Sequence, residues 1–477
     1  MRAVDLPGTT LGEAMGKAAE RLASRFVVLG TVLAILVASS PLPGEEPTGP
    51  SPFQEERPSL PADDPLALQS VPDQDPTVVA DALPLSEVPA EAGPTGGQAA
   101  EPPIYPVLRE HCRASRVYRS EILGRLWFRG EYLAWTTKGV DLPALVTGSP
   151  LLTDPDLAGV LPDASILFGD ETIFDQMSHG ARFTLGFWWD PQQLGGIEAT
   201  YLGLPVNEVR HYSQGTGDAI VARPYFDVST GQQDAALVAY PDVLDGSIDV
   251  RADMELQGAE VLLRRLAVCR PGLRVDLLGG YRFGRLVDRL TTYEEMTSLD
   301  ASSGYEPDTT IERFDLFKSI NDFHGGEAGL ALCCTRGCWS VELLGKVGVG
   351  GTFTGIRIDG ETIVTDDAGS STERGGLLAL RKKNIGYHID SEVALMSELG
   401  LSLRCQVTCD LSVSVGYNLL HWTDLGRAAD QIDLDTDPGL LPPIPGGSLV
   451  GQPPADLDVR RGDFWAQGLN VCLEQQF

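Results

Sequence analysis

Apolar and polar residues alternate in two neighbouring runs within residues 395–419, which a short connection joins. In the second run, the odd positions from 411 to 419 are apolar, and the even positions are small or polar. In the first run, Leu399, Leu401 and Leu403 share one side, while Glu398 and Arg404 lie on the other. Side chains of a strand alternate between its faces, so each run predicts a strand with one apolar face. A soluble β-sandwich would bury that face against a second sheet, whereas a membrane barrel would turn it towards lipid.

Runs of the same kind recur along the chain and predict ten strands in all. Besides the two runs above, they span 124–137, 181–190, 197–204, 259–268, 273–283, 322–334, 339–350 and 464–477. The connections alternate between long and short, which is typical of a barrel with long extracellular loops and short periplasmic turns. An even number of strands places both ends of the barrel at the short-turn rim. We therefore predict an all-β fold, an up-and-down antiparallel transmembrane β-barrel of about ten strands.

All seven tryptophans fall in or beside predicted strands, at or near strand ends. Such positions are typical of the aromatic girdles at the two membrane interfaces, although the core of a soluble sandwich would explain any single one equally well. The seven are Trp127, Trp135, Trp188, Trp189, Trp339, Trp422 and Trp465.

The residues before the barrel divide into two segments. Residues 1–44 carry an apolar stretch at 26–38, which is shorter than the ~20 residues of a spanning helix and has the length of an export signal. We expect a signal peptide or a signal anchor there. Residues 45–103 are acidic and rich in proline without apolar periodicity, so we expect a disordered spacer. The barrel is then assigned to residues 104–477.

The net charge of −31 argues against nucleic acid, and against anionic lipid as the main partner, because both would be repelled. With 6 His and 8 Cys in the chain, we expect no catalytic residues, no cofactor and no metal site. His324 begins a strand, and no serine or cysteine is placed beside it by spacing. The acidic run 430–437 does not fit an EF-hand loop, because Pro438 and Ile444 occupy the positions of the turn glycine and the closing glutamate.

Charged residues on the faces opposite the apolar ones are expected to point into the lumen. In a narrow barrel, nearly balanced acids and bases would pair across the lumen and fill it. The alternative is a charged constriction that selects small solutes. The residues are Arg129, Glu131, Glu198, Glu260, Arg264, Asp276, Arg282, Glu342, Lys346, Glu398 and Arg404.

Cysteines gather at the predicted short turns, on one rim. Cys334 and Cys338 flank three residues, and Cys405 and Cys409 do the same. In an exported protein each pair could close a disulfide across its own hairpin, so we predict two stapled turns. A zinc site is the alternative, but zinc thiolates usually come as closer pairs.

Several ordered sequence blocks resemble a family of bacterial outer-membrane proteins, β-barrel porin family seven. The blocks include 126–127 (LW), 131–133 (EYL), 180–182 (GAR), 277–282 (LLGGYR), 321–326 (NDFHGG), 384–386 (NIG), 430–433 (DQID) and 464–469 (FWAQGL). The similarity covers roughly residues 120–477. It implies an outer-membrane barrel of a Gram-negative-type envelope, and it brings no catalytic or ligand-binding residues.

These observations favour an outer-membrane β-barrel that acts as a porin or as a structural surface barrel, with small solutes passing through a narrow charged lumen as one function. The partners expected are outer-membrane lipid and small solutes, not nucleic acid. The alternatives are a secreted soluble β-sandwich that binds envelope polymers and an outer-membrane hydrolase. The hydrolase would need a Ser–His pair at the rim. The oligomeric state is left open.

Overall fold

The computed structural model describes residues 123–442 and 458–477. The expected signal segment (1–44), the acidic spacer (45–103) and the first residues assigned to the barrel (104–122) lie outside the described residues. No helix in the described ranges is long and apolar enough to cross a membrane.

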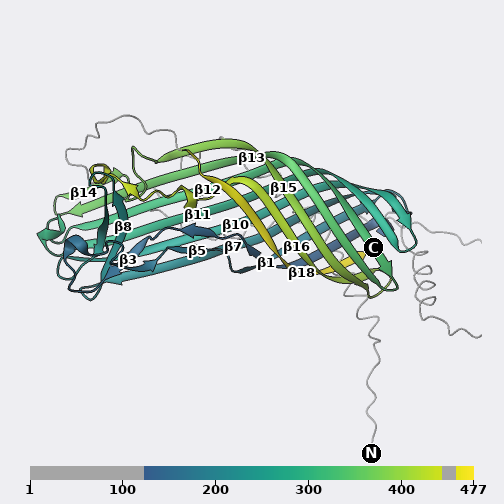
Figure 1. Ribbon diagram of the computed structural model, residues 1–477, viewed down its shortest axis with the longest axis horizontal. Helices are drawn as coiled ribbons and strands as arrows, with labels where there is room; N and C mark the ends of the chain where they lie inside the picture. Colours follow the sequence, from purple (N-terminus) through teal and green to yellow (C-terminus); the bar gives the residue numbers. More distant parts are fainter. Residues whose placement is uncertain (1–122, 443–457) are drawn as a thin grey trace, which may run out of the picture. The chain divides into compact units, whose positions relative to one another are not determined.

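Ten long strands form a closed antiparallel ring, in which β1 pairs with β6 on one side and with β18 on the other (Figure 1). The ring continues from β6 through β7, β10, β11, β12, β13, β15 and β16 to β18. The prediction of a ten-stranded up-and-down barrel is confirmed, and each predicted run falls in one ring strand. The strands are β1 (Leu126–Thr137), β6 (Met177–Trp188), β7 (Gly195–Gly215), β10 (Leu244–Arg270), β11 (Leu273–Ser298), β12 (Thr310–Arg336), β13 (Trp339–Asp366), β15 (Gly386–Gln406), β16 (Leu411–Gly426) and β18 (Arg461–Gln476).

The apolar faces of the ring strands point outwards. Leu401 on β15, Val415 on β16 and Leu473 on β18 each keep about half of their surface exposed. Equivalent residues on the neighbouring strands continue this surface around the ring. A contiguous apolar surface of this extent is foreign to a soluble monomer, whereas lipid covers it in a membrane barrel. The structure is therefore a transmembrane barrel and not a soluble β-sandwich.

The long connections differ from the expected irregular loops, because much of their length is strand. β10, β11, β12 and β13 run far beyond the predicted segments, and further short strands lie between ring strands. These are β2 (Val140–Leu142), β3 (Val146–Ser149), β4 (Ser165–Phe168), β5 (Glu171–Ile173), β8 (Ile220–Asp227), β9 (Gln232–Ala239), β14 (Gly369–Arg374) and β17 (Asp435–Thr436). Five of them form a sheet in which β8 pairs with β3, β9 and β17, and β3 pairs with β4; β2 pairs with β5.

A hydrophobic core lies between these short strands and the extended parts of the ring strands. Ile248 and Val250 on β10 and Leu290 on β11 are buried in one cluster with Val221 on β8 and Val238 on β9. We call this region the cap: the extensions of β7 and β10–β13 together with β2–β5, β8, β9, β14 and β17. The rest of the ring is the membrane section. Two layers of strands around an apolar core give the cap the architecture of a small soluble domain.

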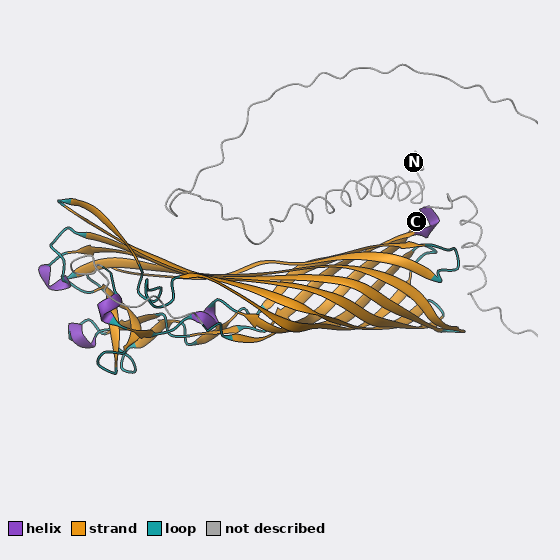
Figure 2. Ribbon diagram, turned by 90° about the horizontal axis from the view of Figure 1, so that it is seen from above, coloured by secondary structure: helices purple, strands orange, loops and turns teal. Residues whose placement is uncertain are grey.

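Figure 2 shows the two regions at opposite ends of the strands: the closed lattice of tilted strands near the C-terminus, and the cap at the other end. Five short 3₁₀ helices lie outside the strands in the described residues. η1 lies beside the C-terminus, and the others lie towards the cap. They are η1 (Leu123–Arg125), η2 (Pro155–Leu157), η3 (Ala301–Ser303), η4 (Ala429–Gln431) and η5 (Pro438–Leu440).

Candidate functional site: the charged lumen

Every one of the eleven charged residues expected on inward faces takes part in ion pairs inside the ring. The middle of the lumen is organised by Glu398 on β15, whose carboxylate contacts three cations. Arg182 lies 2.8 Å from it, Lys346 2.9 Å and Arg282 3.2 Å. These contacts join strands β6, β11, β13 and β15, so they cross the lumen instead of following one hairpin.

The same middle layer contains further carboxylates that satisfy the remaining donors. Lys346 donates to both oxygens of Glu260 at 2.7 Å. Arg282 donates to Glu327 at 2.5 Å, and Arg182 lies 3.9 Å from Glu131. Burying a charge is costly unless it is paired and hydrogen-bonded, and each cation of this layer has at least two carboxylates within 4 Å.

A second charged layer lies nearer the short-turn rim, in two groups. Arg404 lies between Glu342 (2.9 Å) and Glu474 (3.1 Å), and Arg129 contacts the same two carboxylates. On the other side of the ring, Arg264 pairs with Glu198 and Asp276, both at 3.0 Å, and Arg274 pairs with Asp276 at 2.8 Å.

Apolar side chains close the lumen on the cap side of the charged layers. Five large side chains there each expose less than 2% of their surface: Leu133, Trp135, Phe323, Trp422 and Phe464. The rings of Phe323 and Trp422 meet edge to face, with centroids 6.1 Å apart. Below this layer, a cavity of about 20 Å³ lies among residues that include Arg182, Glu260, Arg282 and Glu398. This volume holds about one water molecule.

Four of the seven tryptophans face the lumen, so the girdle interpretation is wrong for these four. Trp127, Trp135, Trp188 and Trp422 are buried. Three of them support the guanidinium groups of lumen arginines: Arg129 lies over Trp127, Arg182 over Trp135, and both Arg264 and Arg274 over Trp188. An arginine stacks favourably on the face of an indole ring, so these tryptophans stabilise the arginines of the charged layers.

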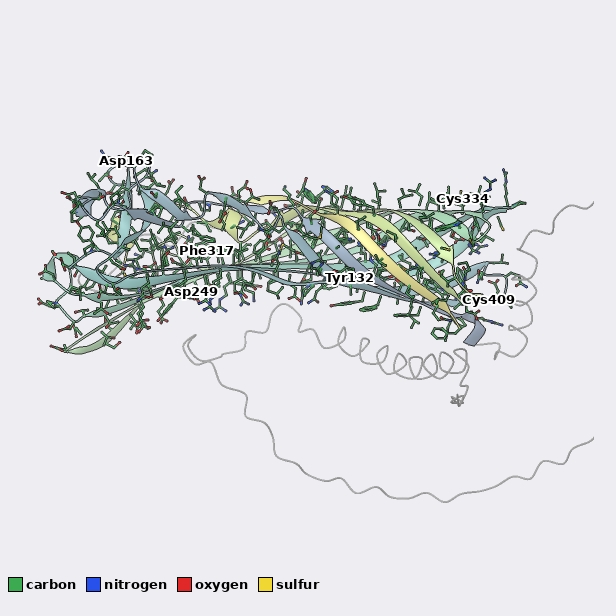
Figure 3. All side chains as sticks on the ribbon, turned by 90° about the horizontal axis from the view of Figure 1, so that it is seen from below. Tyr132, Asp163, Asp249, Phe317, Cys334 and Cys409 are labelled. Carbon is green, nitrogen blue, oxygen red and sulfur yellow. The ribbon has the colours of Figure 1, made fainter. Side chains whose placement is uncertain are left out.

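Outward-facing aromatic residues mark the edge of the membrane section towards the cap. Tyr132 Oη lies 2.7 Å from His179 Nδ1, and Tyr281 Oη lies 2.6 Å from His324 Nδ1. The ring of His324 also contacts the ring of Phe353. Figure 3 shows Tyr132 between Cys409 at the short-turn end and Phe317 on the cap side. At the short-turn rim, Trp189 and Trp339 face outwards and are each 51% exposed.

Four lumen residues were missed by reading the sequence: Arg182, Arg274, Glu327 and Glu474. Each lies on a predicted strand, on the face opposite an outward apolar neighbour such as Phe183 or Leu473. Alternation alone therefore could have found them. What it could not give is their partners, because those lie on strands far apart in sequence.

Residues 127–477 match the model of a protein family that is described as Putative beta barrel porin-7 (BBP7). The chain belongs to this family. It is an outer-membrane β-barrel, as the sequence resemblance implied. A comparison with curated proteins found no match.

Two solved structures are similar to this chain at low scores. The outer membrane protease OmpT of Escherichia coli is 9% identical with a TM-score of 0.36, and the match covers 76% of this chain and 99% of OmpT. The toluene transporter TodX of Pseudomonas putida is 8% identical with a TM-score of 0.15, over 76% of this chain and 92% of TodX. Neither score supports an inference about activity.

The short-turn rim of this BBP7 member contains neither predicted disulfide, because Cys334, Cys338 and Cys405 have free thiols. The strand register gives the reason. Cys334 lies opposite Val341 across the β12–β13 hairpin, and Cys405 lies opposite Val413 across the β15–β16 hairpin. The other cysteine of each expected pair, Cys338 or Cys409, lies in the turn itself. Spacing along the chain therefore did not predict which side chains meet.

A serine–histidine contact does occur in the cap of this family member. His211 Nε2 lies 2.7 Å from Ser213 Oγ on the same strand, β7. The ring of His211 stacks on Phe168 with centroids 5.1 Å apart, and burial lowers the pKa of His211. Within residues 123–442 and 458–477, no carboxylate forms a hydrogen bond or ion pair with His211. The charge of Glu171 acts against the lowering by burial and raises the pKa of His211.

Two residues of the acidic run 430–437 have partners within the chain. Asp433 pairs with Lys383 at 2.9 Å, and Asp437 accepts a hydrogen bond from the backbone N–H of Gly439 at the start of η5. The part of this BBP7 chain that the structure describes holds no group of three metal-ligating side chains.

Proposed function

We propose that this protein is a structural surface barrel, whose closed lumen anchors the cap at the outer face of the outer membrane. The single observation that carries the proposal is the filled lumen. Two layers of paired charges and one layer of large apolar side chains are stacked along the lumen. The cavity among the charges of the middle layer is about 20 Å³. A general-diffusion pore needs a continuous aqueous path, and these packed layers favour a closed lumen instead.

The orientation follows from the connections. The β10–β11 and β12–β13 hairpins turn within two residues at one rim, between Arg270 and Leu273 and between Arg336 and Trp339. Barrels of this class place short turns in the periplasm and long segments outside the cell. In this orientation the cap faces the medium, where its charged outer surface is hydrated.

Passage of small solutes is the second candidate function. It is favoured by the cavity among Arg182, Glu260, Arg282 and Glu398, whose walls are charged. The proposal assigns no catalytic step to the chain.

Single-channel recording in planar bilayers separates the two functions. The refolded barrel, checked for heat-modifiable migration on gels, is expected to insert without conductance steps. Stable steps from folded protein would contradict the closed-lumen proposal. If steps occur, solute passage predicts that Glu260→Gln changes their ion selectivity, because Glu260 lines the cavity. Glu255→Gln is the matched control, since Glu255 lies on the same strand with its side chain on the outer face.

A further inference from the structure

Three basic residues lie side by side on the outer face of the cap. In the strand register, Arg289 on β11 is directly opposite Lys318 on β12, and Lys318 is directly opposite Arg357 on β13. All three face outwards, because their neighbours along each strand, such as Phe317, are buried. The side chains of Arg289 and Arg357 are 44% and 59% exposed.

This row is electrostatically unfavourable by itself, since like charges directly opposite each other in a sheet repel. The outer two cations have acid partners at the flanks: Arg289 lies 3.9 Å from Asp253, and Arg357 lies 3.2 Å from Asp359. Lys318, in the centre, forms no ion pair with any residue that the structure describes. Burial lowers the pKa of Lys318, and so do the positive charges of Arg289 and Arg357. A position that would favour a carboxylate thus holds a third cation.

The row also has a defined distance from the membrane section. Arg357 follows the girdle residue Phe353 by four positions on β13, and Lys318 precedes His324 by six on β12. With a rise of ~3.3 Å per residue and a tilt of ~40°, the row lies about 10–15 Å beyond the girdle. Outward-facing Val287 and Ile320 lie directly opposite each other between the two levels. On β11 and β12 the wall therefore presents aromatic side chains, then the Arg285–Asp322 ion pair, then apolar and finally cationic side chains.

We infer that this row binds the phosphorylated sugar headgroup of a glycolipid in the outer leaflet. A phosphate above Lys318 would contact all three cations and remove their mutual repulsion. The apolar residues below would pack against the lipid-proximal part of the same molecule. The headgroup of an ordinary phospholipid is too thin to reach this height, because the interfacial layer adds only ~5–8 Å on each side of the hydrocarbon. The inference rests on the proposed orientation of the barrel and not on whether the lumen conducts.

The net charge of −31 does not oppose this inference, although it argued against anionic lipid as the main partner. Screening limits the reach of surface charges to about 8–10 Å at physiological ionic strength. A phosphate at the row therefore interacts with the local cations and is little affected by acids on distant parts of the chain.

Native mass spectrometry of the full chain in detergent tests the inference, with a rough lipopolysaccharide whose core sugars carry phosphate as the probe. The wild-type protein is expected to bind it, and to bind phosphatidylcholine much more weakly. Each basic residue near a membrane surface contributes about 1 kcal/mol, which is about fivefold in affinity. Lys318→Gln should therefore weaken binding about fivefold. The triple variant Arg289→Gln, Lys318→Gln, Arg357→Gln should weaken it about a hundredfold.

Two variants serve as matched controls. Lys318→Arg keeps the charge and should keep the affinity. Arg251→Gln removes an outward arginine of the cap that is 52% exposed and lies outside the row, and it should bind as the wild type does. Heat-modifiable migration verifies the fold of each variant, and the single variants carry the test if the triple variant does not fold.

Equal binding of the lipid by the wild type and Lys318→Gln would overturn the inference. Displacement of the lipid by inorganic phosphate at equal concentration would overturn the glycolipid assignment, since a free anion would then satisfy the site. A conductance measurement has no bearing on either result, so failure here and failure of the closed-lumen proposal are distinguishable.

Discussion

The long strand β10 passes through two regions in which the polarity of its faces is opposite. In the membrane section of β10, Leu263 faces outwards and is 52% exposed, while Arg264 faces inwards. In the cap section of the same strand, Arg251 faces outwards and Val250 is completely buried inside. The alternation continues without interruption, but the apolar residues change sides. The outer medium is lipid in one region and water in the other, and this difference explains the inversion.

The interiors of the two regions differ for a related reason. The cap has a second sheet against its inner face, so apolar side chains from two layers form a core. The membrane section has only its own strands around a narrow lumen, and its inward charges satisfy each other across that lumen. A core of this kind depends on complete pairing, because a buried charge that loses its partner keeps its desolvation cost.

The largest expected effect comes from breaking the charged core. In Glu398→Gln, three cations lose the carboxylate that joins them, which should lower the free energy of unfolding by about 3–5 kcal/mol. Urea unfolding in lipid vesicles, followed by tryptophan fluorescence, measures the change. Glu255→Gln on the outer face of the cap is the control and should change stability by less than about 0.5 kcal/mol. A loss below ~1 kcal/mol in Glu398→Gln would show that the lumen charges are solvated.

The same substitution on the two sections of one strand tests the inversion itself. Leu330→Arg places a charge on the lipid face of β12 and should cost about 2–4 kcal/mol. Leu316→Arg places it on the outer face of β12 in the cap, where water solvates it, and should change stability by about 0.5 kcal/mol or less. The same urea experiment measures both. Equal costs at the two positions would mean that the boundary between the sections has been placed wrongly.

The smallest expected effect concerns pH and the cap alone. Burial lowers the pKa of His211 below its usual 6.5, so the unfolded state binds the proton more readily than the folded state does. The contribution of His211 to stability is therefore present above pH ~6.5 and declines as the pH falls through that value. Hydrogen exchange of the cap amides should quicken between pH 7.5 and 5.5, after correction for intrinsic rates. His211→Gln should remove this increment, and an unchanged increment in the variant would contradict the assignment to His211.

Alternation along the chain was sufficient to find every ring strand and the direction in which its side chains point. Leu399 and Glu398 are a clear case, because successive side chains of any strand lie on opposite faces whatever surrounds it. The even strand number and the order of short turns also follow from local signals. The lumen charges at Arg282 and Lys346 were found in this way before their partners were known.

Tertiary structure decided what lies beside each face. The extensions of β10–β13 were not predicted as strands, because their inward apolar residues have meaning only when the five-stranded sheet covers them. Trp135 and Trp422 are placed inside by the arginine and threonine they contact, and Cys334 lies opposite Val341 by a register that spacing does not encode. Periodicity along a strand is a local property, whereas the environment of each face is created by residues that are distant in sequence.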